Sequence, residues 1–325
     1  VEGISTALQV AAGGIHTCAL LSGGSVKCWG NSGHGELGNG AYVEAQKSPV
    51  DVTGITNAVE IASGLNHVCA ILTTRAVKCW GFNDYGQIGN GSTDWAWTPA
   101  DVVGISSAVH ITGGAFHTCA VLTDGSVKCW GYNAFGPLGD GTSVTKTTPV
   151  TVSGVSSATQ VAGDNDHSCA LISNGTMKCW GANYEGGLGD GSTNKSYYAV
   201  DVTNITTATQ IASGRYFTCA RLADGTIRCW GNNDFGQLGD GTTTKRSVAV
   251  EVAGIHTAVQ VATGNSQTCA VLANGRLKCW GNNWAGQIGD GTLTTRHTPT
   301  FVLGINDTPP PTPSVSGAPN GTTPS

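Results

Sequence analysis

The triplet Cys-Trp-Gly occurs six times at a nearly constant spacing, and this repetition constrains the fold more than any other feature of the chain. The triplets begin at positions 28, 79, 129, 179, 229 and 279, so the period is 50 residues with one interval of 51. A second cysteine stands ten positions before each triplet, and no cysteine is left over. A fixed period of this length indicates structural repeats, each of which buries its apolar surface against its neighbours.

The third copy shows what one unit contains. No stretch of it has helical periodicity, and turns rich in Gly, Asn, Asp and Thr separate its short apolar runs. These runs predict four strands, called A to D in chain order: Ala108–Gly113, His117–Leu122, Ser126–Gly131 and Thr148–Val152. Four strands in about 50 residues are typical of a propeller blade. We therefore predict an all-β fold, a β-propeller of six four-stranded blades over residues 1–305 with a tail over 306–325.

The two cysteines of each unit flank the hairpin between strands B and C. In the third unit the loop is Thr123-Asp124-Gly125, whose glycine can adopt the left-handed conformation that closes a three-residue hairpin loop. Counting outward places Cys119 opposite Cys129 in a non-hydrogen-bonded pair, with Cα atoms about 4.5 Å apart. That separation allows a disulfide. We predict six hairpin disulfides: Cys18–Cys28, Cys69–Cys79, Cys119–Cys129, Cys169–Cys179, Cys219–Cys229 and Cys269–Cys279. The second unit has Arg75 in place of the glycine, which predicts strain or a different turn there.

Metal binding is the competing interpretation of the cysteines. Four histidines stand two residues before the first cysteine of a pair, on the same face of the strand: His16, His67, His117 and His167. A Cys2His site is geometrically conceivable, although C-x9-C matches no common zinc spacing. Two units keep both cysteines but have Phe217 and Gln267 in place of the histidine. Because a disulfide tolerates this replacement and a metal site does not, we predict disulfides and no bound metal.

Composition and charge narrow the range of partners. Charged residues make up 11% of the chain, against about 25% in average domains, and the formal net charge is −5. No block of Lys or Arg is present, so we expect no binding to nucleic acid or to an anionic membrane surface. No run approaches the roughly 20 apolar residues of a membrane helix, so we expect no membrane insertion. A disulfide in every repeat predicts a secreted, extracellular or cell-surface protein, and we expect any secretion signal to have been removed before Val1.

Three recurring motifs make the repeat recognisable. They read G-x-x-H-x-C-A-x-L, D-G-x-x-K-C-W-G and N-x-x-G-Q-L-G-D-G-T, and they are most complete between Gly214 and Thr242, with Phe217 in place of the histidine. Across all six units this pattern resembles the repeat of the regulator of chromosome condensation family. The resemblance implies a β-propeller, usually of seven blades, in a family that includes a nuclear exchange factor for a small GTPase, parts of ubiquitin ligases and bacterial inhibitors of β-lactamase. This chain departs in having six units and paired cysteines, and no residue of the nuclear role is carried over.

The two ends of the repeat array are in phase. The chain opens with Val1-Glu2-Gly3-Ile4, and the sixth unit ends with Val302-Leu303-Gly304-Ile305, both copies of the V-x-G-I link between strand D and the next strand A. We therefore predict a closed ring of six blades, with the last D strand against strands of the first blade. A ring completed by a missing seventh unit and an open spiral are the alternatives.

Comparison of the six copies locates the variable positions. Antiparallel strands put the AB and CD loops on one face and the BC and DA turns on the other, and the variation is concentrated in the AB and CD loops. Aromatic residues on variable polar loops are typical of recognition surfaces. Rings directly before the fixed glycine of the CD loop, such as Tyr85 and Phe135, are expected to pack between blades. Our candidate binding or assembly residues are Trp95, Trp97, Tyr197, Tyr198, Phe116, Arg215, Tyr216 and Trp284.

The remaining motifs favour structural roles. The six triplet tryptophans are expected in the core: Trp29, Trp80, Trp130, Trp180, Trp230 and Trp280. The G-D-G-T turns lack the spacing of a calcium loop, so we expect the aspartates to accept local turn hydrogen bonds. Asp164-Asn165-Asp166-His167 is the one acidic cluster and a weak cation candidate. No G-x-S-x-G, H-E-x-x-H or P-loop motif is present. We expect no enzymatic activity and no cofactor.

The tail, residues 306–325, is rich in Pro, Thr and Ser, which predicts an extended polyproline-like or disordered linker. Sequons permit N-glycans at Asn90, Asn174, Asn194, Asn204, Asn306 and Asn320.

Two functions are considered, of which we predict the first and keep the second as the alternative. One is a self-associating extracellular structural protein that forms a fibre or surface layer, with the tail contacting a neighbouring subunit. The other is a binding module for an extracellular glycan or protein, including inhibitor-like binding, that uses the AB/CD face.

Overall fold

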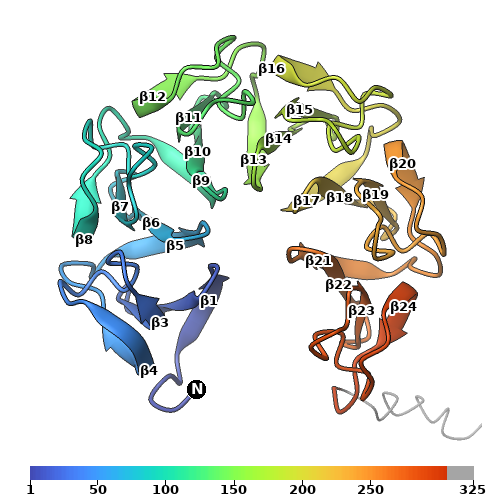
Figure 1. Cartoon of the computed structure of the whole chain (residues 1–325), viewed down its shortest axis with the longest axis horizontal. Coiled ribbons are helices and arrows are strands. Elements are labelled where there is room, and N and C mark those ends of the chain that lie inside the picture. Colours follow the sequence, from blue (N-terminus) through green and yellow to red (C-terminus); the bar gives the residue numbers. More distant parts are fainter. Residues whose placement is uncertain (306–325) are drawn as a thin grey trace, which may run out of the picture.

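Six four-stranded antiparallel sheets form the blades of a β-propeller in the computed structural model, which describes residues 1–305 (Figure 1). In each sheet the strands lie in chain order, with strand A nearest the centre and strand D at the rim. Within residues 1–305 every regular element is a strand, and no helix is long and apolar enough to span a membrane.

The strands recur at equivalent positions in all six blades. The A strands are β1 (Ala7–Ala12), β5 (Ala58–Ser63), β9 (Ala108–Gly113), β13 (Ala158–Gly163), β17 (Ala208–Gly214) and β21 (Ala258–Thr263). The B strands are β2 (His16–Leu21), β6 (His67–Leu72), β10 (His117–Leu122), β14 (His167–Ile172), β18 (Phe217–Leu222) and β22 (Gln267–Leu272). The C strands are β3 (Val26–Ser32), β7 (Val77–Gly81), β11 (Val127–Gly131), β15 (Met177–Gly181), β19 (Ile227–Gly231) and β23 (Leu277–Gly281). The D strands are β4 (Val43–Asp51), β8 (Ala96–Asp101), β12 (Lys146–Thr151), β16 (Ser196–Asp201), β20 (Arg246–Glu251) and β24 (Arg296–Phe301).

The predicted register of the B–C hairpin is confirmed. The Leu122 N–H donates to Ser126 O at 2.9 Å, and β10 pairs with β11 so that Cys119 faces Cys129. All six predicted disulfides are formed, with Cα–Cα distances of 4.0 to 4.1 Å, and no described cysteine is free. Arg75 keeps the same turn with a positive φ of 66°, so the structure has the strained alternative and not a different turn.

The hydrophobic core lies between blades. Each of five apolar clusters combines residues of two consecutive blades, because both faces of an inner sheet are covered by its neighbours. Five of the six triplet tryptophans are fully buried there, as predicted, and each indole N–H donates at 2.8 to 2.9 Å to a backbone carbonyl of the preceding blade. The acceptors are the carbonyls of Glu36, Gln87, Pro137, Gly187 and Gln237.

The prediction of a closed ring is wrong. Figure 1 shows an open arc with the first sheet (blue) and the sixth (red) at its two ends, and β24 belongs to the sixth sheet alone. Val10 is 60% exposed, whereas its equivalents in the other five blades, such as Ile61 at 1%, are buried. Trp29 is only partly buried, and within residues 1–305 its indole has no carbonyl acceptor. Each blade is complete with four local strands, so nothing in the strand order requires the ends to meet.

Candidate functional site

The two faces of the propeller differ in the way that the loop comparison predicts. On one face each AB tip bonds to the start of the CD loop of its own blade, as in the 2.9 Å bond from the Tyr132 N–H to Phe116 O. On the other face the BC turn bonds to the DA link of the next blade, as in the 2.9 Å bond from the Ala158 N–H to Gly125 O. The AB and CD loops therefore share a face, opposite the BC and DA turns.

A continuous series of aromatic rings lies on the AB/CD face and crosses the first four blades. Neighbouring rings have centroids 4.6 to 6.5 Å apart, and most pairs meet edge to face or tilted. Edge-to-face contact is a favourable arrangement for aromatic pairs. We call this series the aromatic belt, which consists of Tyr42, Trp97, Trp95, His34, Phe82, Tyr85, Phe116, Tyr132, Phe135 and Tyr184.

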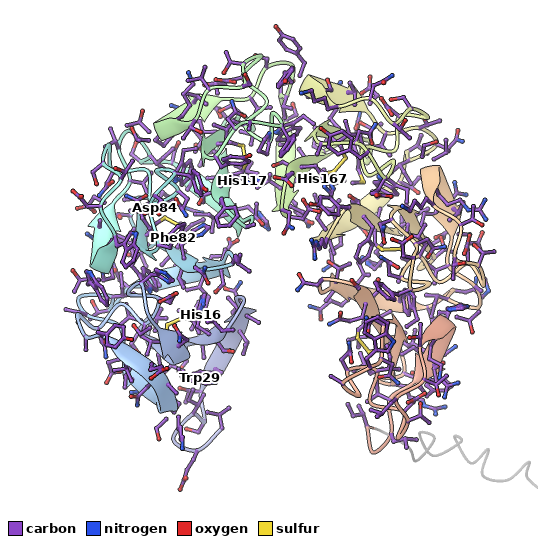
Figure 2. The ribbon with its side chains drawn as sticks, viewed as in Figure 1. His16, Trp29, Phe82, Asp84, His117 and His167 are labelled. Carbon is purple, nitrogen blue, oxygen red and sulfur yellow. A yellow bond between two sulfur atoms is a disulfide. The ribbon has the colours of Figure 1, made fainter. Side chains whose placement is uncertain are left out.

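Polar contacts fix the rings at the start of the belt. The Trp95 Nε1–H donates to Asp84 Oδ1 at 2.7 Å, which orients the indole above the CD loop of the second blade (Figure 2 labels Phe82 and Asp84 in this blade). His34 Nδ1 lies 2.9 Å from the Oε1 atom of the fully buried Glu36. Trp95 remains 39% exposed and Tyr184, at the far end, 59% exposed. The belt therefore consists of positioned rings that still offer surface to a ligand.

A cluster of charged residues lies next to the end of the belt. In the fourth and fifth blades Lys245 Nζ lies 2.5 Å from Glu185 Oε2 and 3.6 Å from Asp234 Oδ1. Beyond this ion-pair cluster a separate pair, Phe235 and Trp284, has centroids 5.0 Å apart. Trp284 is 68% exposed, so it is an aromatic residue of the same face outside the belt.

The structure divides the predicted binding residues among four places. Trp95, Trp97 and Phe116 join the belt, and Trp284 lies outside it. Tyr197 and Tyr198 lie at the start of β16 against Gly136 and Gly141 of the preceding blade. Arg215 and Tyr216 form the AB tip of the fifth blade, with the guanidinium 5.5 Å from the centroid of the adjacent Tyr216 ring.

Sequence comparison missed three belt residues, Phe82, Tyr132 and Tyr42. Phe82 and Tyr132 occupy the position directly after Cys-Trp-Gly, where the other four units have Asn or Ala. That variation is visible in the sequence. Tyr85 and Phe135, expected to pack between blades, contact rings of adjacent blades and are also partly exposed.

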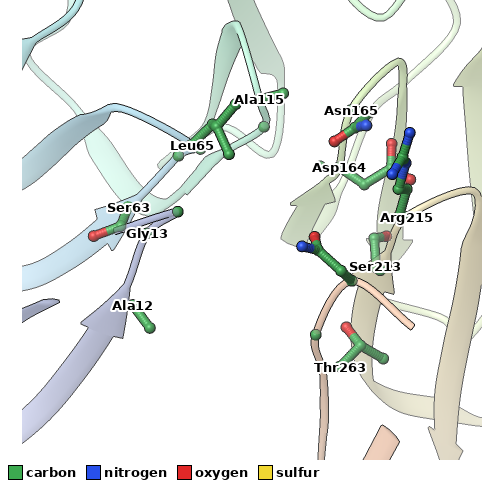
Figure 3. Close-up of a pocket in the computed structure, with 18 of the residues that line it drawn as sticks. Ala12, Gly13, Ser63, Leu65, Ala115, Asp164, Asn165, Ser213, Arg215 and Thr263 are labelled. Carbon is green, nitrogen blue, oxygen red and sulfur yellow. The ribbon is translucent and has the colours of Figure 1, made fainter. Parts of the chain in front are cut away.

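A cavity of about 420 Å³ opens at the centre of the arc and is lined by the AB loops of all six blades (Figure 3). Asp164 faces it but is already engaged, because Oδ1 accepts the N–H groups of Asp166 and His167 and Oδ2 accepts that of Tyr216. Burial beside Asp164 raises the pKa of the Asp166 carboxyl, and the Tyr216 hydroxyl donates to Asp166 Oδ2 at 3.3 Å. Within residues 1–305 no cluster of three His, Cys, Asp or Glu side chains could hold a metal ion.

The four histidines beside the disulfides are buried, and Figure 2 labels three of them, His16, His117 and His167. The Nε2 atoms of His67, His117 and His167 lie 2.8 to 2.9 Å from the hydroxyls of Thr118, Ser168 and Thr218 in the next blade. Because the cysteines are in disulfides and three of the rings are paired with hydroxyls, the Cys2His alternative is excluded. The turn aspartates behave as predicted, since Asp140 Oδ1 accepts both the N–H and the hydroxyl of Thr142.

We expect acid to destabilise the fold between pH 6.5 and about 4. Burial lowers the pKa of His67 to about 3 and those of His16, His110 and His117 to about 4. The unfolded chain therefore binds more protons in this window, and the free energy of unfolding falls as the pH drops. The loss is on the order of 3 kcal/mol for each of the buried rings of His16, His67 and His117, and smaller for His110, whose side chain is 32% exposed. Glu60 has the opposite effect on stability, because burial raises its pKa to about 7. This single carboxyl does not offset the four histidines. Urea unfolding at pH 7.5 and 4.5 measures the difference.

The fifth blade supplies a matched control, because it has Phe217, also fully buried, where four other blades have histidine. His67→Phe removes one titrating ring but leaves Thr118 bonded to Gln87 O. The variant is expected to lose less stability than the wild type between pH 7.5 and 4.5. Equal losses in the two proteins would show that His67 is not responsible.

The predicted glycosylation sites lie partly within the described residues. Asn174, Asn194 and Asn204 are exposed and Asn90 is partly buried, whereas Asn306 and Asn320 lie outside the described residues. In the BC turn of the fourth blade Asn174 Oδ1 accepts the hydroxyl of Thr176 at 2.7 Å. Glycosylation at these positions stays a prediction.

Comparison with protein families identifies the repeat. A model of the regulator of chromosome condensation (RCC1) repeat matches once in every blade, together over more than half of the chain: residues 8–36, 58–87, 108–136, 159–186, 208–237 and 258–287. A second model of the same repeat matches residues 23–71, 77–121, 124–171 and 224–271.

Some similar proteins match a short segment of this sequence, and others have a similar three-dimensional structure. Human probable E3 ubiquitin-protein ligase HERC3 is 37% identical over 86 residues, which are 26% of this chain and 8% of that protein. The chain spans less than a tenth of the length of such relatives. Human WBSCR16 superimposes with a TM-score of 0.84 at 20% identity, over 93% of this chain and 83% of that one. Yeast RCC1 (Prp20), solved bound to Kap60, gives 0.80 at 21% identity, over 91% and 74%.

Proposed function

The chain belongs to the regulator of chromosome condensation (RCC1) repeat family, and from that premise we propose that it is an extracellular, non-enzymatic interaction protein whose aromatic belt binds an extended segment of a partner protein. The propeller fold of this family implies a protein-interaction or binding module. The observation that supports this role most is the continuity of the belt across four blades. An extended ligand can follow such a surface from blade to blade.

The chemistry of the belt favours an uncharged, apolar segment. Two carboxylates beside its first rings are occupied, Asp84 by Trp95 and Glu36 by His34, and the charged cluster at Lys245 lies beyond the last ring. Rings that are already packed against one another lose little conformational entropy when a ligand binds. Rigid aromatic anchors of this kind are enriched in the energetic centres of protein interfaces.

Redox chemistry supports the proposed extracellular location. Twelve cysteines in six disulfides are unusual for a reducing cytosol and typical of secreted proteins. The low content of charged residues gives no reason to propose nucleic acid as a partner.

The belt can be tested with peptide arrays and glycan arrays probed by the full chain. We expect apolar and proline-containing peptides to be retained, and Phe116→Ser, at the centre of the belt, to weaken their binding at least about tenfold. Trp284→Ser is the matched control, since Trp284 lies on the same face outside the belt. If the chain binds glycans but no peptides, the partner is a carbohydrate and not a protein. If it binds neither array, the proposal is refuted.

Self-association is the second candidate function, and the uncovered ends of the arc favour it. The first blade exposes Val10 and part of Trp29, which inner blades bury against a preceding blade. The sixth blade leaves Ile305 40% exposed, although Ile255, the equivalent residue before it, is buried. Repeat arrays usually cap such ends with polar surface. The predicted contact of the tail with a neighbouring subunit involves residues outside the described range.

A further inference from the structure

The segment that follows the last blade has the chemistry that the aromatic belt favours. Residues 306–325 include Pro309-Pro310-Pro311-Thr312-Pro313, and Asp307 is their only charged side chain. Proline-rich segments favour the polyproline II conformation and dock on aromatic-lined surfaces, where their restricted backbone lowers the entropy cost of binding. The same chain therefore contains both a positioned aromatic surface and a proline-rich segment with a single charged side chain.

The position at which the last blade ends bears on whether the proline-rich segment reaches the belt of its own molecule or that of a second copy. Gly304 and Ile305 occupy the DA link position of the sixth blade, equivalent to Gly254 and Ile255. DA links lie on the face with the BC turns, because the Ala258 N–H, at the end of such a link, bonds to Gly225 O in the BC turn of the preceding blade. The chain thus leaves the propeller on the face opposite the belt.

The end of the described chain and the belt also belong to different blades. The last described residues belong to the sixth blade, at one end of the arc, whereas the belt crosses the first four blades (Figure 1). Within one molecule, a segment that begins on this face would have to reach the opposite face before it met the belt. When two molecules stack face to back, the face on which the described chain ends meets the belt of the next copy, and 20 residues of polyproline II would span about 60 Å.

We propose that the aromatic belt of one molecule binds the proline-rich segment 306–325 of a second copy of the chain. This inference rests on the proposed use of the belt as a binding surface and names its occupant. The contact joins different surfaces of the two copies, so it is heterologous, and each bound copy presents a free belt or a free tail to the next. Repetition of the contact produces a linear polymer of propellers stacked face to back.

The test measures the mass of the full chain by sedimentation over a range of concentrations, with electron microscopy of the largest species. The wild type is expected to form concentration-dependent oligomers. Replacement of Pro309, Pro310 and Pro311 by serine should abolish them, and Phe116→Ser should shift the midpoint of assembly to at least about tenfold higher concentration. A synthetic peptide of residues 306–320 should dissociate wild-type oligomers and bind the Phe116→Ser variant at least about tenfold more weakly.

Two control variants separate this contact from other forms of assembly. Trp284→Ser leaves the belt intact and should assemble like the wild type. Val10→Lys places a charge on the uncovered end of the arc and should also leave assembly unchanged. Oligomers that survive the proline and Phe116 replacements but are lost in Val10→Lys would overturn the inference in favour of contact through the blade ends.

The proposed function and this inference can fail separately. A monomeric wild type that still binds unrelated apolar peptides through Phe116 would refute the tail as occupant and leave the belt as a binding surface. A monomer whose belt binds added peptide more tightly after the proline replacements would show that the tail occupies its own belt, which also overturns a second copy. Absence of any peptide binding, with the fold intact by circular dichroism, would refute both.

Discussion

Reduction of all six disulfides is expected to unfold the protein under conditions where the oxidised form is stable. Each disulfide closes a hairpin between cysteines ten positions apart and contributes about 2 to 3 kcal/mol on the loop-entropy model. Six contribute on the order of 15 kcal/mol, which equals or exceeds the whole stability of a typical domain, about 5 to 15 kcal/mol. The reduced, alkylated chain should therefore lack the far-ultraviolet dichroism of the native sheets at 25 °C, whereas a folded reduced chain would contradict this account.

Native-state reduction should also be selective. Cys69, Cys119, Cys169 and their partners are buried beneath the following blade, but no blade covers the sixth, and Cys269 is partly exposed. A thiol reductant must reach a sulfur atom to attack it, so Cys269–Cys279 should open first. Timed alkylation followed by peptide mass spectrometry measures the order. The double variant Cys269→Ala/Cys279→Ala is the control, since it should remove the fast phase and leave the slow one unchanged.

The sequence was sufficient to predict the architecture of each blade because the constraints are local. The loop at Gly125 fixes which residues of β10 and β11 face each other, so the position of Cys119 opposite Cys129 follows from counting. The strands β9 and β10 have their predicted bounds, while β12 begins at Lys146 and not at Thr148. Strand D pairs across a register shift near Gly131, a bulge that the alternation of side chains does not reveal.

Closure and the belt could not be predicted because both depend on how one blade meets the next. The two V-x-G-I links show that the chain ends are in phase, but the angle between blades is set by packing at residues such as Trp180 and Leu138. Phe116 was predicted as a surface aromatic from its own loop. Its contacts with Phe82 and Tyr85 of the preceding blade require the interblade geometry.

Trp180→Ala is expected to destabilise the protein by about 3 to 5 kcal/mol, the usual cost of deleting a large buried aromatic side chain. Trp180 is fully buried between the third and fourth blades, where it packs with Leu138 and Val152. Its indole N–H donates to Pro137 O at 2.8 Å, and the Ser168 hydroxyl donates to the same carbonyl. Truncation therefore removes the indole hydrogen bond and leaves only the one from Ser168. Urea unfolding followed by circular dichroism measures the loss in the free energy of unfolding.

Trp29→Ala is the control that shows whether the loss in Trp180→Ala comes from the interface between blades. Trp29 has the same position in the repeat and the same neighbours in the triplet, but it lies at the uncovered end of the arc, and within residues 1–305 its indole N–H has no acceptor. Because a partly exposed ring loses less buried surface and no hydrogen bond, its replacement should cost less than about 1.5 kcal/mol. Equal losses for Trp29→Ala and Trp180→Ala would mean that another surface covers the first blade in solution, and the face of the arc at Val10 would then be the place to look for it.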